Sequence, residues 1–182
     1  DTASAVASIG LEPGDAFISC GTWSLVGVAR DTPLATPEAL AAGLSNESGP
    51  DASTLLLANC TGLWIAQQLK IEMEESLGRG LTWQGIAEEV RASHASTFLF
   101  DTEDPSLARP GNMLGKLERL AREEGIEGDL GIAALFGSMY ESLARQYAQV
   151  IERLQRVTGE PVERIRVIGG GSRNAVLCQM VA

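Results

Sequence analysis

The most informative segment of the chain reads RIRVI (164–168), GGGSRN (169–174) and AVLCQMVA (175–182). Its β-branched residues predict a short buried strand, and the apolar run at its end predicts the first turns of a helix. Between them, Gly169, Gly170 and Gly171 carry no Cβ, so a ligand can approach their backbone closely. The N–H groups that open a helix lack partners within it and can face an anion. The segment therefore predicts a nucleotide site, with a simple tight turn as the alternative.

Two apolar runs near the start of the chain predict a β-hairpin. Residues 16–20 and 23–29 are rich in strand-forming side chains, and the pair Gly21 and Thr22 separates them. Residues 54–58 predict a further strand. The turn-rich segments 31–37 and 44–50 predict loops.

The middle of the chain predicts three helices. Residues 62–77 place Ile65, Leu69, Met73 and Leu77 four apart, which makes one apolar face. Residues 82–90 predict a shorter helix, and a long helix capped by Asp129 ends near residues 158–159. Strands come first, helices fill the middle and a strand–helix unit closes the chain, so the fold class is mixed α/β.

Composition narrows the class of protein. The chain has 182 residues, of which 45% are apolar, enough for one large domain with its own core. It carries 14 basic and 24 acidic residues, and it has no basic cluster of the kind that binds nucleic acid. No apolar run reaches the roughly 18 residues that a membrane-spanning helix needs. We therefore expect neither nucleic acid nor a membrane as a partner.

Cysteine and histidine restrict the possible chemistry. Cys20, Cys60 and Cys178 are odd in number and far apart, which is typical of reduced thiols in a cytoplasmic protein. His94 is the only histidine, so this chain alone can build neither a Ser-His-Asp triad nor a histidine-based metal site. We expect no metal bound by protein side chains alone.

Both ends of the chain indicate a piece of a longer protein. The first residue is Asp1 and not Met, and residues 177–182 read as helix interior without a Gly or Pro stop. We expect residues 1–182 to form one domain that is cut at both ends.

Three polar residues are candidates for chemistry. Asp1 precedes small residues, which would let a substrate reach its carboxylate, although an Asp there is also an ordinary helix N-cap. Asn59 and Gln67 lie eight residues apart, about two helical turns, so an N-cap position and a helix face could look into one cleft. Capping or core packing is the default interpretation of both.

Six short motifs follow one another along the chain: DTASAV (1–6), FISCGTWSL (17–25), TPEAL (36–40), LSNE (44–47), ANCTGLW (58–64) and VIGGGSRN (167–174). In this order they resemble the carboxy-terminal half of the FGGY family of carbohydrate kinases. The GTWS and NCTGLW runs are most similar to the rhamnulokinases within that family.

The resemblance implies an actin-like ATPase (ribonuclease H-like) fold, as the carboxy-terminal half of a two-domain sugar kinase. ATP and sugar would bind between the two domains, so the partner of this chain would be the amino-terminal kinase domain with its own phosphate loop. The implied reaction is ATP-dependent phosphorylation of a ketose, foremost L-rhamnulose to L-rhamnulose 1-phosphate in rhamnose catabolism. Mg²⁺ would bridge ATP oxygens and keep several waters.

The resemblance also assigns residues to the sugar and to the phosphates. Asp1 matches the catalytic base, and Thr2 lies next to it at the sugar. Asn59 matches a position that lines the cleft toward sugar or nucleotide. Gly21 and Thr22 match the hairpin turn that faces the terminal phosphates.

The remaining matches concern the nucleotide. Gln67 matches a cleft position toward it, and Gly170, with Gly169 and Gly171, matches the turn against which adenosine packs.

Two alternatives stay open. The first is another FGGY kinase, for example one that acts on L-fuculose, and the second is a non-catalytic actin-like module that binds nucleotide. Asp1 favours an enzyme, because a binding module has no need of a carboxylate in this motif. Because two domains must close to assemble such a site, we expect this chain alone to be inactive.

Overall fold

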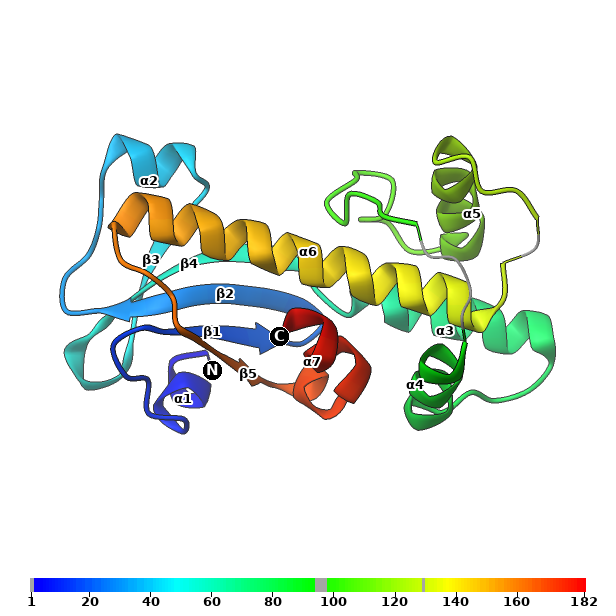
Figure 1. Cartoon of the computed structure of the whole chain (residues 1–182), viewed down its shortest axis with the longest axis horizontal. Coiled ribbons are helices and arrows are strands. Elements are labelled where there is room, and N and C mark those ends of the chain that lie inside the picture. The colour runs from blue at the N-terminus through cyan, green and yellow to red at the C-terminus, as the bar shows by residue number, and fades with distance from the viewer. Residues whose placement is uncertain (1, 94–97, 129) are drawn as a thin grey trace.

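The computed structural model contains a five-stranded sheet with helices on both faces and beyond one end (Figure 1), and it describes residues 2–93, 98–128 and 130–182. Its elements, with η for 3-10 helices, are α1 (Thr2–Ala7), β1 (Asp15–Cys20), β2 (Trp23–Arg30), α2 (Pro37–Ala41), β3 (Ser45–Ser48), η1 (Pro50–Ala52), β4 (Thr54–Thr61), α3 (Trp64–Leu77), α4 (Trp83–Ala92), α5 (Met113–Glu123), α6 (Ile132–Thr158), β5 (Arg164–Ile168), η2 (Gly170–Arg173) and α7 (Ala175–Val181).

The sheet has the strand order β3-β4-β2-β1-β5. β1 and β2 form the predicted hairpin, with Cys20 opposite Ser24 next to the turn. β2 pairs antiparallel with β4, and β4 with β3. β5 returns after the helices and runs parallel to β1. Because β5 is an edge strand of the described sheet and its residues are half-buried or exposed, the expected burial of this strand was wrong.

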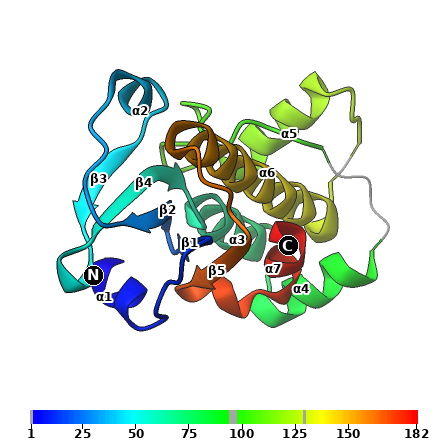
Figure 2. The ribbon, with the colours of Figure 1, turned by 60° about the vertical axis from the view of Figure 1, so that its left-hand side comes forward.

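The two faces of the sheet bury different cores. Ile18, Val26 and Leu56 face the long helix α6 and belong to the large core that also includes α3 and α7. On the opposite face, Phe17 and Leu55 pack with Val6 of α1 in a smaller cluster. This alternation along each strand follows from the two-residue period of β-structure. In the turned view α1 lies at one end of the molecule, and α4 and α5 lie at the other (Figure 2).

The main predicted helices are confirmed. α3 buries Ile65, Leu69 and Met73, but Leu77 is 45% exposed because it is the last residue of the helix. α6 ends at Thr158, where Gly159 adopts the left-handed conformation (φ 72°) that the glycine stop signal predicts. Its N-cap position is occupied by Gly131, and the expected cap Asp129 lies outside the described residues.

Three elements formed where loops or no structure had been predicted. All four residues of β3 are exposed, so the strand has no apolar pattern and depends on pairing with β4. α2 begins behind Thr36, whose Oγ1 accepts from the Ala39 N–H at 3.2 Å. At the start of α5, Glu72 of α3 accepts from the N–H groups of Met113 and Leu114, each at 2.8 Å. These helices therefore depend on caps, one of them 41 positions distant.

Candidate functional site

The hairpin turn between β1 and β2 rests on the start of α3. The carbonyl oxygen of Gly21 accepts from the Leu63 N–H at 2.8 Å, and that of Thr22 accepts from the Trp64 N–H at 3.0 Å. Two of the N–H groups at the beginning of α3 are thereby satisfied by the turn. As a result the turn and the helix hold each other in place.

The same turn brings two predicted site residues together. Gln67, one turn into α3, donates from Nε2 to Thr22 Oγ1 at 3.3 Å, and Thr22 Oγ1 lies 3.4 Å from Gln67 Oε1. These distances are long for hydrogen bonds, and the pair is solvent-exposed. A ligand oxygen could therefore replace either contact at low cost.

Gly62 is a residue of this junction that the sequence reading did not single out. A Cβ at Gly62 would lie 2.6 Å from the Gly21 carbonyl oxygen and 2.7 Å from Ser24 Oγ. Only glycine allows the end of β4 to pass this close to the hairpin. The signal was present in the NCTGLW motif, but its cause is a tertiary contact.

The glycine turn after β5 lies directly beside the end of β1. Gly169 has φ 83°, and a Cβ on it would lie 2.7 Å from the Cys20 carbonyl oxygen. A Cβ on Gly171 would overlap Cys20 Sγ and lie 2.7 Å from Cys20 Cβ. Gly170 differs, because nothing lies within 4 Å of its Cβ position. Two of the glycines thus serve packing, and the third presents open backbone.

The expected anion-facing helix start after this turn was wrong. The turn continues as the short helix η2, and Asn174 then caps α7. Asn174 Oδ1 accepts from the N–H groups of Val176 at 3.1 Å and Leu177 at 3.2 Å. Because a side chain already satisfies these donors, they are not free for a phosphate.

Asn59 lies near the end of β4 and not at a helix N-cap, so that expectation was also wrong. It is exposed and stands opposite Leu25 of β2, on the face that carries α1. Leu25 in turn stands opposite Ser19 of β1, and Ser19 opposite Ile168 of β5. Asn59 therefore belongs to a row of residues that crosses the sheet close to both turns. It lies two residues before Thr61, the last residue of β4, which pairs with Trp23.

Of the two residues assigned to the sugar at the start of the chain, Asp1 lies outside the described residues. Thr2 begins α1, whose Val6 packs against Phe17 of β1 on the same sheet face as Asn59. His94 also lies outside the described residues.

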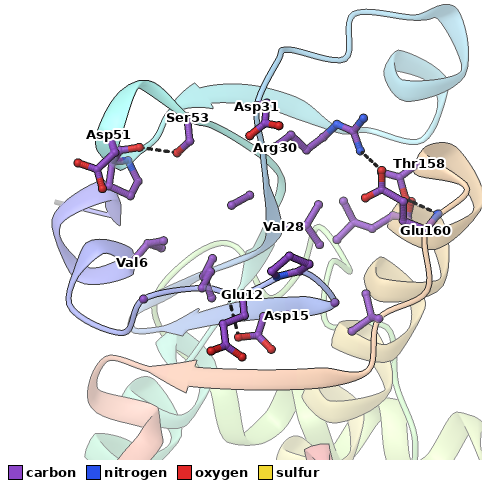
Figure 3. Close-up of a pocket in the computed structure, with 18 of the residues that line it drawn as sticks. Val6, Glu12, Asp15, Val28, Arg30, Asp31, Asp51, Ser53, Thr158 and Glu160 are labelled. Atoms are coloured by element: carbon purple, nitrogen blue, oxygen red, sulfur yellow. Dashed lines mark hydrogen bonds and ion pairs between the residues drawn. The ribbon is translucent and has the colours of Figure 1, made fainter.

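A cavity of about 630 Å³ opens at the far end of the sheet from the hairpin turn (Figure 3). Two of its charged groups pair with each other, since Arg30 Nη1 lies 3.1 Å from Glu160 Oε1, and the buried Asp15 binds Arg164 and Arg166, which lie outside the lining. Of the predicted site residues that the structure describes, none lines the cavity. Its size alone does not make it the functional site.

Asp15 illustrates how these charges are held. Burial alone would raise its pKa, but hydrogen bonds from the Glu12 N–H and from the Nε atoms of Arg164 and Arg166 outweigh burial and lower it. The distances are 3.1, 2.6 and 3.1 Å respectively. The carboxylate is therefore a structural anchor between β1 and β5.

Neither a metal cluster nor a membrane span is found in the parts of the chain that the structure describes. Over residues 2–93, 98–128 and 130–182, no three His, Cys, Asp or Glu side chains gather as they would around a metal ion. Over the same ranges, no helix is long and apolar enough to cross a bilayer.

Comparison with known sequences gives a consistent relationship. The family model described as "FGGY family of carbohydrate kinases, C-terminal domain" matches residues 16–182. A rhamnulokinase of Bacillus subtilis is 34% identical over 183 residues, and one of Pectobacterium carotovorum is 36% identical over 184 residues. Each match covers 100% of this chain but only 37% and 36% of the relative. The chain thus spans little more than a third of the length of these relatives.

Solved structures agree on the fold. A xylulose kinase from Rhodospirillum rubrum superposes with a TM-score of 0.64 at 15% identity, covering 99% of this chain and 34% of that one. A Plasmodium falciparum glycerol kinase with ADP superposes with a TM-score of 0.63 at 15% identity, covering 100% and 36%. The shared architecture is that of the actin-like, ribonuclease H-like sugar kinases.

Proposed function

Since the chain belongs to the FGGY family of carbohydrate kinases, whose C-terminal domain model it matches, we propose that it is the carboxy-terminal half of an ATP-dependent ketose kinase. The acceptor that we propose is L-rhamnulose, phosphorylated to L-rhamnulose 1-phosphate. The names of the curated relatives support this sugar.

One observation carries the nucleotide part of the proposal. The hairpin turn with Thr22, the side chain of Gln67 and the open backbone of Gly170 come from three distant segments and lie around the end of β1. Gly170 offers bare backbone with free space, against which a flat adenosine can pack. The exposed Thr22 hydroxyl and the Gln67 amide at the hairpin turn can bind polar groups of the same ligand.

Each residue has a role that fits its surroundings. The Thr22 hydroxyl gives up its long contact with Gln67 and donates to a terminal phosphate oxygen. Gln67 turns its amide to the nucleotide. Gly169 and Gly171 hold the glycine turn against Cys20, so Gly170 stays in place. ATP would supply the phosphoryl group, and a Mg²⁺ ion bound with it would offset the negative charge of the phosphates.

On the sugar side, Asp1 accepts the proton of the attacking hydroxyl, which is the usual role of a positioned carboxylate. Thr2 and Asn59 orient the sugar through polar contacts. Correct orientation of the hydroxyl matters here, because phosphoryl transfer depends on positioning and charge stabilisation more than on covalent chemistry.

The whole reaction would need an amino-terminal domain. The chain spans 37% and 36% of its two rhamnulokinase relatives, and closure of two domains would assemble the site and exclude water. We propose that this kinase acts in the cytoplasm, where its three free cysteines would stay reduced.

The test is a substrate panel with the full-length kinase. ATP-dependent phosphorylation of L-rhamnulose, L-fuculose, D-xylulose and glycerol is compared as kcat/KM, and the chain of residues 1–182 alone is assayed beside it. L-Rhamnulose should be preferred, and the chain alone should be inactive. Preference for another sugar would correct the substrate only. ATP binding without turnover on any sugar would favour a non-catalytic nucleotide-binding module.

A further inference from the structure

A buried hydroxyl lies directly beneath the hairpin turn. Tyr147 of α6 places its OH 2.7 Å from Ser24 Oγ and 3.5 Å from Cys20 Sγ. All three residues are buried, with Tyr147 only 1% exposed. Cys20 and Ser24 are the cross-strand pair that closes the turn of Gly21 and Thr22. One hydroxyl therefore contacts both strands at the base of the turn.

The two partners of Tyr147, Cys20 and Ser24, also contact other segments of the proposed site. Cys20 packs against the glycine turn, since Cβ positions on Gly169 and Gly171 would lie 2.7 Å from its carbonyl oxygen and its Cβ. Ser24 Oγ lies 2.7 Å from the Cβ position of Gly62, where β4 turns toward α3. Only one residue, Cys20 or Ser24, thus lies between the Tyr147 hydroxyl and each segment that surrounds the end of β1: the glycine turn, the hairpin turn and the end of β4.

The chemistry of Tyr147 calls for an explanation beyond packing. A phenylalanine would fill nearly the same volume, and burying a hydroxyl is unfavourable unless it is hydrogen-bonded. Burial first, and then the neighbouring Cys20, raises the pKa of Tyr147 well above its usual range, so the group stays a neutral donor and acceptor. A neutral hydroxyl can donate to one partner and accept from another.

We infer that Tyr147 is a positioning residue, whose hydroxyl fixes the hairpin turn and the glycine turn relative to each other and thereby sets nucleotide affinity. The inference rests on the proposed function for the nucleotide, but the fixing of the turns is independent of it. Tyr147 does not touch the ligand, and its effect passes through Ser24 and Cys20.

The experiment compares Tyr147→Phe with a matched control in the full-length kinase. Ser142→Ala removes another buried hydroxyl of α6, whose oxygen accepts from the Phe100 N–H at 3.1 Å and which contacts neither turn. ATP affinity is measured by calorimetry, KM is measured separately for ATP and sugar, and amide hydrogen exchange is followed at residues 20–24 and 169–171.

For Tyr147→Phe we expect ATP affinity to fall and KM for ATP to rise by about five- to tenfold, as the loss of one hydrogen bond allows. KM for sugar should stay unchanged, and exchange should become faster in both turns. Ser24→Ala should act in the same direction, and the double variant should be no worse than the stronger single one, because both remove one interaction. Ser142→Ala, which also costs one buried hydrogen bond of α6, should leave ATP affinity and exchange in both turns unchanged.

The two levels of the inference fail separately. A lower melting temperature with unchanged ATP affinity and unchanged exchange would reduce Tyr147 to a core residue and overturn the inference. If the wild-type protein binds no ATP, the proposed function fails, and the exchange rates still decide whether Tyr147 fixes the turns. Additive effects of Tyr147→Phe and Ser24→Ala on ATP affinity would also contradict the inference.

Discussion

The backbone of Gly171 lies against the side chain of Cys20, and no methyl group fits between them. This contact joins the turn after β5 to the end of β1, so the two parts of the proposed nucleotide site share one packing constraint. Gly170, one residue earlier, is free of it.

The two neighbouring glycines should therefore differ sharply in stability. Gly171→Ala forces a Cβ into Cys20 and should destabilise the fold by about 1–3 kcal/mol, the usual cost of overpacking. Gly170→Ala meets nothing within 4 Å and should change stability by less than about 0.5 kcal/mol. Urea unfolding of the chain measures both. Equal losses in the two variants would contradict the contact with Cys20.

Gly170 should instead control nucleotide affinity. Gly170→Val adds a branched side chain on the open backbone where adenosine is proposed to pack, so ATP affinity of the full-length protein should fall while the fold stays intact. Calorimetric ATP titration and circular dichroism measure the two quantities. Unchanged affinity in a folded Gly170→Val variant would remove this turn from the nucleotide site.

Asp1→Asn should separate catalysis from capping. The change keeps the size of the side chain but removes the proton acceptor, so kcat should fall by about 10²–10⁴-fold if Asp1 is the general base. ATP affinity should barely change, because the carboxylate is proposed to face the sugar hydroxyl. Asn caps a helix about as well as Asp. A normal kcat at saturating sugar would therefore assign Asp1 to capping alone.

Acid should weaken the link between β1 and β5. The pKa of Asp15 is lowered in the folded protein, so its ionised form stabilises the fold above the unfolded value near 3.8, and this contribution is lost as pH falls through the lower folded value. At neutral pH, Asp15→Asn should cost roughly 2 kcal/mol, because hydrogen bonds to a charged group are lost.

The pH series provides the control for that prediction. The difference in unfolding free energy between wild type and Asp15→Asn should shrink below about pH 4, where the carboxylate becomes protonated in the unfolded chain. Asp31→Asn, at an exposed position of the same cavity, should change the unfolding free energy at neutral pH by less than about 0.5 kcal/mol. A gap between wild type and Asp15→Asn that persists at the lowest pH would argue against the ion pairs.

The three thiols should differ in reactivity. Cys20 and Cys60 are buried, and burial, with a smaller effect from Glu103, raises the pKa of Cys60 to about 12. Burial also raises the pKa of Cys178, but this thiol is only partly buried and is therefore the accessible one. Ellman's reagent at pH 8 should label one thiol in the folded protein and all three after unfolding, because only the accessible thiolate reacts. Cys178→Ser should abolish the native reaction, and a second reactive thiol in the folded wild type would be incompatible with the described core.

The sequence predicts those helices, strands and turns that side-chain period and turn residues determine locally. The hairpin around Gly21 and Thr22, the strand Arg164–Ile168 and the end of α6 just before Gly159 all follow from side-chain period and turn residues. β3 could not be predicted in this way, because its four residues are exposed and only β4 makes them a strand.

The candidate site was predictable in part for the same reason. The motifs identified the residues of both turns, but the contact of Gln67 with Thr22 joins positions 45 apart, and no local pattern contains it. The apolar run ends at Ala58, so the sequence predicts the end of a strand there and a helix cap at Asn59. In the structure β4 continues to Thr61, which places Asn59 inside the strand. The sequence alone assigns Tyr147 no role beyond packing, since the partners of its hydroxyl lie in another part of the chain.

The pairing of β5 with β1 also has a consequence for how the chain folds. β1 to β4 lie within the first 61 residues, whereas the strand that completes the sheet beside β1 begins at Arg164. At 5–20 residues per second, synthesis of the intervening segment takes about 5–20 s, during which β1 presents an unpaired edge. Such edges can pair with other chains, and parallel closure over so long a distance is slow. The unpaired edge of β1 would therefore need protection most before Arg164 has left the ribosome and can pair with Asp15. The helices between β4 and β5, or a chaperone, could cover the edge during this time.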